Sequence, residues 1–422
     1  MCCFFRHYLA SAVVTHSGGI VTNPNPPKLF GPEMLTDPYP FYRRLRETDP
    51  VYRSGELDAW IVTSYEAVNG ALRNPQFSSD RFPRLRQRLA SKGLDSLAQD
   101  RVRSMIHMDP PDHTRLRSLV NKAFTPKTVE SMASHVQDIV NDLLDAVKSR
   151  GTMDVIEDFA YPLPVTVIAE MLGVPAADRA RFKHWSDEVS VVLGGDVAAL
   201  SETLLRRATT AREELADYFR EIVRQRRTNP GPDLISALTQ AEEEGGKLSE
   251  DELYSTVVLL LVAGNETTTN LIGNGMLALM RHPDEMGKVW DSPSLVPAAV
   301  EEMLRFDSPV QLTTRMARTD LEIQGTKIPK GDWLYLVVGA ANRDPAQFPD
   351  PDRFDVSRTD NKHIAFGAGA HFCLGAPLAR LETQIALRAL IERFPELRLG
   401  KEPIEYRNNF NLRGLKSLSV DF

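Results

Sequence analysis

One long helix constrains the fold of this chain more than any other feature. Ser249 and Glu252 form a capping box, and the helical pattern that they open continues to about Arg281. Because an α-helix rises about 1.5 Å per residue, a helix of this length crosses an entire domain. The sequence therefore predicts a domain with one long central helix.

Most of the other segments are also helical in pattern. The stretch from Thr125 to Gly151 begins with a capping residue and a proline, ends with a glycine, and repeats apolar residues at helical spacing. Residues 201–230 predict another long amphipathic helix, whereas strand patterns gather in 319–340. No repeat or long linker divides the 422 residues, although that length alone would allow two or three domains. We therefore expect a single domain that is mainly α with a small β region.

Composition and charge argue against several classes of protein. Apolar residues make up 42% of the chain, charged residues 25%, and the net charge is −7. We therefore expect no nucleic-acid partner. We also expect no membrane span, because no segment offers the roughly 20 apolar residues that one needs. The three cysteines, at positions 2, 3 and 373, form no disulfide framework, which fits a reducing cytoplasm.

The N-terminal segment 1–34 is expected to be a flexible leader, with the folded domain at 35–422. A small-residue site at Ala10–Ala12 faintly resembles the end of a signal peptide. Arg6 and His7, however, interrupt the apolar run that such a signal requires. We therefore expect a soluble, cytoplasmic protein without a targeting signal.

The long helix changes character near its middle. An apolar stretch, Val257–Ala263, runs directly into Gly264, Asn265, Glu266 and Thr267. Unpaired polar groups on a buried face cost free energy, and a threonine hydroxyl can bond back to the preceding turn and bend the helix. The pattern therefore indicates either a local opening that presents Glu266 and Thr267 to a ligand, or a helix that turns its polar face to solvent.

Two charged pairs have the spacing of one helix face. Glu302 and Arg305 are three residues apart and can pair, although such pairs are common on solvated surfaces. His113 and Arg117 are four residues apart and could hold an anion such as a carboxylate. A solvated basic face is the simpler interpretation of the second pair.

A lone cysteine, Cys373, lies in the glycine-rich stretch FGAGAHFCLG. Zinc would need about four close ligands, and only His371 is near. A cysteine hydrolase would need a distant histidine base, which the sequence leaves open. A flat macrocycle explains the frame better, because Gly367, Gly369 and Gly375 let the backbone approach a planar ring. The helix that follows favours the thiolate form, which is a haem ligand.

With these motifs in place, the chain resembles the cytochrome P450 family, the haem-thiolate monooxygenases, in its soluble bacterial form. The resemblance spans about Leu35 to Val420. The family signature Phe-x-x-Gly-x-x-x-Cys-x-Gly is matched without departure by Phe366, Gly369, Cys373 and Gly375. The remaining family motifs are matched in the expected order by His113, Arg117, Ala263, Gly264, Glu266, Thr267, Glu302, Arg305, Arg315, Arg353 and His371.

The resemblance implies haem b, iron protoporphyrin IX, bound between the long central helix and the helix after the cysteine loop. Cys373 would be the ligand of the iron. Two haem propionates would be neutralised by His113, Arg117, Arg315 and His371. Further contacts with the haem would come from Ala263, Phe366, Gly367 and Gly375. A buried network of Glu302, Arg305 and Arg353 would brace the cysteine loop from behind.

The resemblance also implies an activity, the hydroxylation or epoxidation of a lipophilic small molecule with O2. Thr267 would hydrogen-bond the bound dioxygen, and Glu266 would relay protons to it. No dinucleotide fingerprint appears, so the electrons of NAD(P)H would arrive through a ferredoxin and a ferredoxin reductase. Arg115 and Arg380 could help to dock the ferredoxin, or they could be ordinary solvated arginines. A monomer is expected.

The substrate, by the same resemblance, would be a polyketide, terpenoid, steroid or fatty acid. The pocket roof would include 78–103 and 182–215. The pocket lining would include Leu259, Val262, Val310, Gln311, Thr313, Phe410 and Leu412. The arginine-rich stretch 81–103 either attracts a carboxylated substrate such as a fatty acid or forms a solvated mobile loop.

Two other functions stay open beside a monooxygenase. One is a peroxide-driven or rearranging haem-thiolate enzyme, and the other is a non-catalytic haem-binding sensor or carrier. The acid–alcohol pair Glu266 and Thr267 favours reductive activation of dioxygen over both.

Overall fold

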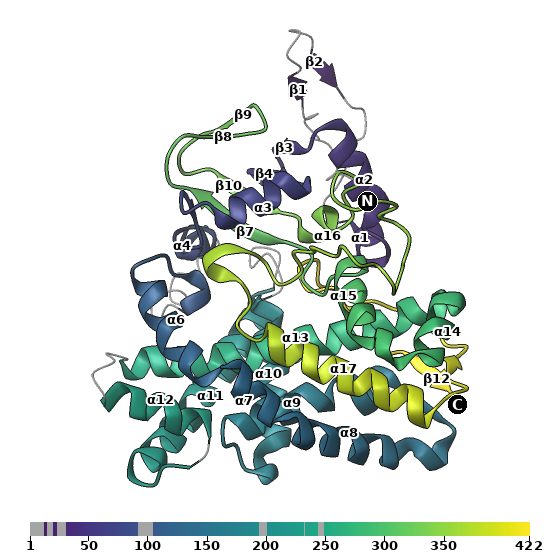
Figure 1. Ribbon diagram of the computed structural model, residues 1–422. Helices are drawn as coiled ribbons and strands as arrows, with labels where there is room; N and C mark the ends of the chain where they lie inside the picture. The colour runs from purple at the N-terminus through teal and green to yellow at the C-terminus, as the bar shows by residue number, and fades with distance from the viewer. Residues whose placement is uncertain are drawn as a thin grey trace, which may run out of the picture.

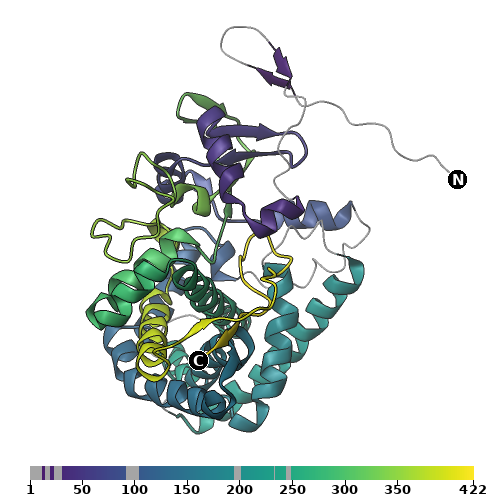
Figure 2. The ribbon, with the colours of Figure 1, turned by 90° about the vertical axis from the view of Figure 1, so that its right-hand side faces the viewer.

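The computed structural model describes residues 12–14, 20–22, 31–91, 104–193, 201–231, 233–243 and 249–422 (Figures 1 and 2). Most of the expected leader, 1–34, lies outside these residues. Within it, the strands β1 (Ala12–Val14) and β2 (Ile20–Thr22) pair antiparallel, and the short helix α1 (Pro32–Thr36) spans the expected boundary. The division of the chain at 34/35 stays a prediction.

Helices make up most of the described chain. After α1 they are α2 (Tyr39–Thr48), α3 (Tyr65–Arg73), α4 (Phe82–Ala90), α6 (Asp112–Ala123), α7 (Pro126–Ser131), α8 (Ala133–Val147), α9 (Pro162–Met171), α10 (Arg179–Leu193), α11 (Glu202–Thr228), α12 (Leu234–Glu243), α13 (Glu250–Arg281), α14 (Pro283–Asp291), α15 (Val296–Phe306), α16 (Val338–Ala341) and α17 (Ala376–Arg393).

The predicted central helix is confirmed as α13. Its capping box is present, because the Ser249 side chain accepts from the Glu252 backbone N–H and the Glu252 carboxylate accepts from the Ser249 N–H. Figures 1 and 2 show α13 passing through the helical part of the molecule, where it packs against α9, α11, α15 and α17. Its residues form part of the main hydrophobic core, with Val257 and Leu261 fully buried. The single, mainly helical domain is therefore also confirmed.

The helix expected between Thr125 and Gly151 is divided in two. Thr125 caps α7 by accepting from the Thr128 N–H, as its position predicts. That helix ends at Ser131 and α8 begins at Ala133, with Met132 between them, and Gly151 follows α8 and a 3₁₀ turn at φ 70°. The apolar spacing continues across Met132, so the pattern alone could not show the break. The helix predicted at 201–230 is confirmed as α11.

The β structure is small, as predicted. A five-stranded sheet has the order β3 (Val51–Ser54), β4 (Ala59–Val62), β10 (Trp333–Leu336), β7 (Thr313–Ala317) and β5 (Phe77–Ser78), in which only β10 and β4 are parallel. Smaller sheets are formed by β8 (Leu321–Ile323) with β9 (Thr326–Ile328), and by β11 (Arg398–Leu399), β12 (Ser419–Asp421) and β6 (Thr152–Asp154). Three of the strands lie in the segment that the sequence predicts, 319–340.

The five-stranded sheet lies at one end of the molecule and the long helices at the other (Figures 1 and 2). Its pairing has a consequence for the site, because β5 joins β7 and so brings residues near 80 beside residues near 315. Within the described residues, none of the helices combines the length and the apolar character that crossing a membrane requires.

Candidate active site

The Cys373 loop is a tight turn between the 3₁₀ turn Gly369–His371 and α17. The Cys373 N–H donates to the Phe366 carbonyl at 2.9 Å, so the two ends of the turn lie together. Gly367 and Gly369 have φ of 71° and 70°, a backbone conformation that favours glycine. A Cβ on Gly369 would lie 2.7 Å from the Leu72 carbonyl oxygen, so this glycine also lets the loop pack on α3.

Opposing effects act on the sulfur of Cys373. Burial raises the pKa of the thiol, whereas the backbone N–H groups of Gly375 and Ala376 and the charges of Arg117 and Arg380 lower it. All four of these groups favour a negatively charged sulfur. Burial outweighs these four groups, so the pKa of the free thiol lies above its usual value, and a metal cation bound to the sulfur would add the charge that favours the thiolate.

Behind the loop, Glu302 and Arg305 form a fully buried ion pair. Arg305 Nε and Nη2 donate to the two carboxylate oxygens, each at 2.7 Å, and neither side chain is exposed. Arg305 also donates to the carbonyls of Asn342 at 3.0 Å, Pro351 at 2.7 Å and Arg353 at 3.0 Å. The pair therefore ties α15 to the chain that leads into the cysteine loop.

The expected place of Arg353 in this network needs correction. Its side chain is 59% exposed and lies 3.9 Å from Glu285 and 3.8 Å from Asp355. Only its backbone carbonyl belongs to the network. The second arginine of the network is instead Arg358, whose side chain is 10% exposed and whose Nε lies 3.3 Å from Glu302 Oε2. Carboxylates near the surface hold Arg353 outward, a feature that spacing along the chain does not reveal.

A second set of charges connects α15 to the loop. Arg380 donates to both oxygens of Glu301, at 2.6 and 2.8 Å, and His363 Nε2 lies 3.0 Å from the same carboxylate. Both partners lower the pKa of Glu301, to about 2, against the effect of burial. The Arg380 guanidinium also lies 4.6 Å from the centre of the Phe366 ring. Glu301 thus holds Arg380 against Phe366, the residue whose carbonyl accepts the hydrogen bond from the Cys373 N–H.

The two arginines considered for ferredoxin docking are both engaged in ion pairs. Arg380 pairs with Glu301, and Arg115 makes a two-point contact with Glu252. Both pairs are partly exposed. Neither arginine therefore offers an uncompensated positive charge, and their expected role in docking gains no support.

Basic side chains from four segments meet beside the loop. The His113 and His371 rings lie 4.0 Å apart, and His113 is 2% exposed. Arg315 on β7 is 4% exposed and donates to Thr313 Oγ1 at 3.3 Å and to the Thr314 carbonyl at 2.8 Å. Arg81 comes from the turn before α4 and donates to the same Thr313 hydroxyl at 2.8 Å. We call His113, His371, Arg315 and Arg81 the basic cluster.

The basic cluster lacks a matching set of acids. Burial lowers the pKa of His371 to about 3, with further contributions from His113 and Arg315. Burial and the charge of Arg81 lower the pKa of Arg315 to about 9. Asp109 opposes these shifts, but its carboxylate already accepts from Ser78 and from the Ser79 N–H and lies 3.6 Å from Arg318.

An anionic ligand would therefore suit the cluster. His113 Nε2 is buried and has no hydrogen-bond partner in the described part of the chain. A carboxylate there would satisfy this atom and offset the charge of Arg315. Arg117, expected beside His113, instead donates to the Phe372 carbonyl at 2.7 Å and to Asn121 at 3.1 Å, so it contacts the cysteine loop.

The polar part of α13 does not break the helix, and its acid and amide side chains are buried. The helix is continuous, and Thr267 Oγ1 donates to the Ala263 carbonyl at 2.8 Å. Glu266 is 7% exposed and Asn265 is 1% exposed, whereas Ala263 is exposed. The expected local opening of the backbone is therefore absent from α13, although Ala263 and Thr267, one turn apart, are both accessible.

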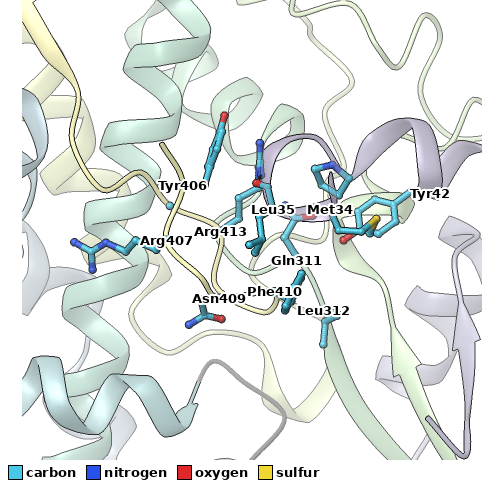
Figure 3. A pocket seen from close by; sticks show the side chains of 12 residues that line it. Met34, Leu35, Tyr42, Gln311, Leu312, Tyr406, Arg407, Asn409, Phe410 and Arg413 are labelled. Atoms are coloured by element: carbon cyan, nitrogen blue, oxygen red, sulfur yellow. Dashed lines mark hydrogen bonds between the residues drawn. The ribbon is translucent and has the colours of Figure 1, made fainter. Parts of the chain in front are cut away.

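Four of the expected pocket residues lie together near the end of the chain. Val310 and Leu412 pair as an antiparallel bridge, which brings Gln311 and Phe410 to one small cavity (Figure 3). That cavity is about 10 Å³, room for one water molecule at most. It is therefore not a substrate site by itself.

The other expected pocket residues have different surroundings. Val262 is 2% exposed and packs in the main core, so its expected place in the pocket lining needs correction. It faces away because its neighbour Ala263 takes the accessible side of α13. Leu259 is partly buried against the same core, and the Thr313 hydroxyl is occupied by the two arginines. Of the expected pocket roof, 78–103 and 182–215, the parts 92–103 and 194–200 lie outside the described residues.

The cysteine loop is supported by a buried Glu–Arg pair, and the long helix α13 carries an acid–alcohol pair. These features are those of a haem-thiolate protein. The family model for Cytochrome P450 matches residues 38–291 and 293–414. The chain therefore belongs to the cytochrome P450 family.

Individual relatives are similar along nearly their whole length. Cytochrome P450 CYP107DY1 of Priestia megaterium is 42% identical and covers 93% of this chain and 97% of its own. The 6-deoxyerythronolide B hydroxylase of Saccharopolyspora erythraea is also 42% identical, with 93% and 98% covered. The crystal structure of P450BioI with an acyl carrier protein bearing hexadec-9Z-enoic acid has a TM-score of 0.85, at 40% identity, and covers 92% and 99%. The predicted enzyme class, a cytochrome P450 monooxygenase, is thereby confirmed.

Haem is the group that this family implies, and the residues present fit it. The backbone N–H groups and guanidinium charges around Cys373 would stabilise an iron-bound thiolate, and the acid-poor basic cluster suits the carboxylates of a haem. Two residues of the site escaped the sequence analysis. Arg81 is one member of an arginine-rich run, and Arg358 is one of two arginines in the same loop.

Proposed function

We propose that this protein is a haem-thiolate monooxygenase that binds haem b through Cys373. The observation that carries the proposal is the cysteine loop, in which two backbone N–H groups and two guanidinium charges around the sulfur oppose the effect of burial, which on balance raises the pKa of the free thiol. When bound, the haem supplies thiolate-ligated iron that can activate dioxygen. The chain supplies binding, orientation and protons.

The basic cluster would hold the haem by its edge. His113 Nε2 would donate to a propionate, and Arg315 would neutralise its charge, with His371 beside them. The interpretation of His113 and Arg117 as a solvated basic face loses support, because His113 is buried. The Glu302–Arg305 pair, with Arg358, would hold the cysteine loop in position from behind.

Thr267 and Glu266 would manage protons on the opposite side of the haem. Thr267 Oγ1 holds its hydrogen on the Ala263 carbonyl, from which it can turn toward a ligand at the exposed side of α13. Glu266 is buried next to it and can pass a proton to that hydroxyl. Phe366, Gly367, Ala263 and Gly375 would contact the haem itself. A Cβ on Gly375 would meet nothing within 4 Å, so this side of the loop has room for a ring.

The substrate would be a lipophilic small molecule that this enzyme hydroxylates or epoxidises. One relative is named for hydroxylation of 6-deoxyerythronolide B, and a similar structure carries a fatty acyl chain. These names support a polyketide or a fatty acid, and two other similar structures, which hold testosterone and corticosterone, support a steroid as well. Electrons would come from NAD(P)H through a ferredoxin and its reductase, and the enzyme would act as a cytoplasmic monomer.

The proposal is tested by the absorption spectrum of the purified protein, reduced and exposed to carbon monoxide. A strongly red-shifted Soret band is expected for wild type, and its loss is expected in Cys373→Ser. A band typical of imidazole or protonated-thiol ligation would contradict the role of Cys373. Protein expressed with a haem precursor that contains no haem would contradict the proposal as a whole.

The peroxide-driven enzyme and the sensor make different predictions in the same preparation. A peroxide-driven enzyme would form product with peroxide alone and without ferredoxin. A sensor would form no product with either supply of electrons. For a monooxygenase we expect product only when NAD(P)H, ferredoxin and reductase are all present.

A further inference from the structure

Arg81 is anchored by one hydrogen bond and has unused capacity. Its Nη2 donates to Thr313 Oγ1 at 2.8 Å. Its Nε is buried and has no hydrogen-bond partner among the described residues. Burial also lowers the pKa of Arg81, to about 10. A guanidinium group offers five donors in a planar fork, so a buried Nε without a partner calls for a ligand beside it.

Arg315 reaches the same hydroxyl from the other side. It donates to Thr313 Oγ1 at 3.3 Å, so two guanidinium groups meet at one threonine. The positive charge of Arg81 disfavours the protonated form of Arg315, and it therefore contributes to the lowered pKa of Arg315. Within the described chain, neither arginine forms an ion pair with a carboxylate, and Asp109 is held by Ser78, Ser79 and Arg318.

Two adjacent cations, the buried Arg315 and Arg81 with its buried Nε, suit one chemical group, a carboxylate. Its two oxygens match the guanidinium fork, and its charge offsets the repulsion between the arginines. The position also matters, because Thr313 lies on β7 next to the residues expected to line the pocket. The interpretation of Arg81 as part of a solvated loop loses support, because its Nε is buried.

We propose that Arg81 is a carboxylate anchor, which acts with Arg315 across Thr313 at the edge of the haem site. This inference rests on the proposed function. The carboxylate can come from either of two sources, a propionate of the haem or the carboxyl end of the substrate. The second source would make a long-chain acid, rather than a neutral lipid, the preferred ligand.

The test compares holoenzyme variants that carry Arg81→Gln and Arg81→Lys. The matched control is Arg86→Gln, which removes an exposed arginine from α4, the helix that follows Arg81. The first measurement is the rate of haem transfer to apomyoglobin. The second is the Soret shift on titration with palmitic acid and, separately, with its methyl ester.

A haem propionate as the source predicts faster haem loss in Arg81→Gln, by on the order of 10-fold, with no change in the ratio of acid to ester affinity. A substrate carboxylate as the source predicts unchanged haem loss and an affinity for the acid that falls on the order of 10- to 100-fold, while the ester is unaffected. Arg81→Lys should recover part of either effect, because lysine keeps the charge but loses the fork.

The inference is overturned if both Arg81 variants match Arg86→Gln in haem loss and in the acid-to-ester ratio. If wild type binds palmitic acid and its methyl ester equally well, a substrate carboxylate is rejected as the source. The rate of haem loss then decides whether a haem propionate is the source. These failures are separate from failure of the proposed function, which would show as a missing thiolate-type band in wild type.

Discussion

Glu302 and Arg305 meet as a two-point ion pair in which neither side chain is exposed. A pair with this spacing on one helix face is ordinarily a surface feature of small energetic value. Here the remaining donors of Arg305 reach carbonyls of the segment that leads to the cysteine loop. The pair is therefore a connection between α15 and that segment, and its loss leaves a charge inside the protein.

Replacing Arg305 by alanine is expected to destabilise the fold by about 3–5 kcal/mol, because Glu302 would be left buried without its main partner. The free energy of unfolding in urea measures the effect. The control is Arg224→Ala, which breaks an exposed pair with Glu221 of the same i,i+3 type on α11 and should cost under about 1 kcal/mol. Equal losses in the two variants would show that burial does not set the value of the Arg305 pair.

Arg380 and Glu301 should shift the haem reduction potential in opposite directions. Reduction adds an electron near Cys373, so the positive charge of Arg380 favours it and the negative charge of Glu301 opposes it. Potentiometric titration should therefore give a lower potential for Arg380→Ala and a higher one for Glu301→Gln, with Arg380→Lys close to wild type.

Arg393→Ala is the matched control for this pair of variants, because Arg393 also lies on α17 but pairs with Asp145. Its potential should equal that of wild type. Shifts of the same sign in Arg380→Ala and Glu301→Gln would contradict an electrostatic origin and indicate a general loosening of the loop.

Local signals in the sequence predict the fold well where the element depends on local interactions. The capping box at Ser249 and the apolar pattern after it define α13 almost to the residue. The division of 126–147 at Met132 is different, because the apolar spacing continues across it. An interruption of this kind depends on what each half packs against, and that information is distant in the sequence.

The site shows the same limit more sharply. The cysteine loop is contiguous, so its motif could be recognised directly. Arg81 was hidden in an arginine-rich run, because its hydrogen-bond partner, Thr313, is 232 residues away. Arg353 and Arg358 are five residues apart, and only their contacts with Glu285, Asp355 and Glu302 separate the exposed arginine from the buried one.

Thr267→Ala is expected to uncouple electron use from product formation. The variant should keep its fold, because the Thr267 hydroxyl bonds only to its own helix and alanine favours helices. It should also keep the thiolate-type band. Without the hydroxyl, proton delivery at this position fails, and product per NAD(P)H should fall on the order of 10-fold or more, with hydrogen peroxide formed instead.

Thr269→Ala provides the comparison for that experiment. Its hydroxyl makes the same kind of bond, to the Asn265 carbonyl at 3.0 Å, but the residue is fully buried. Product and peroxide per NAD(P)H should stay at the wild-type values. Uncoupling to the same extent in both variants would place the effect in the helix rather than in the Thr267 hydroxyl.

Glu382 should make the stability of the protein depend on pH. It is 2% exposed on α17, its Oε2 has no hydrogen-bond partner in the described chain, and burial raises its pKa to about 8. An unfolded glutamate has a pKa near 4.5, so between these values the folded protein keeps a proton that the unfolded chain releases. Stability therefore falls as pH rises from about 4.5 and levels off above about 8.

Urea unfolding at pH 5, 6, 7 and 8 tests this dependence with Glu382→Gln, which cannot ionise. The free energy of unfolding of the variant, relative to wild type, should rise with pH by about 1.4 kcal/mol per pH unit, a difference on the order of 3 kcal/mol at pH 7. Glu392→Gln, an exposed change on the same helix, should follow the wild-type curve. If Glu382→Gln also runs parallel to wild type across this range, the Glu382 carboxyl is ionised in the folded protein, and burial does not govern its charge.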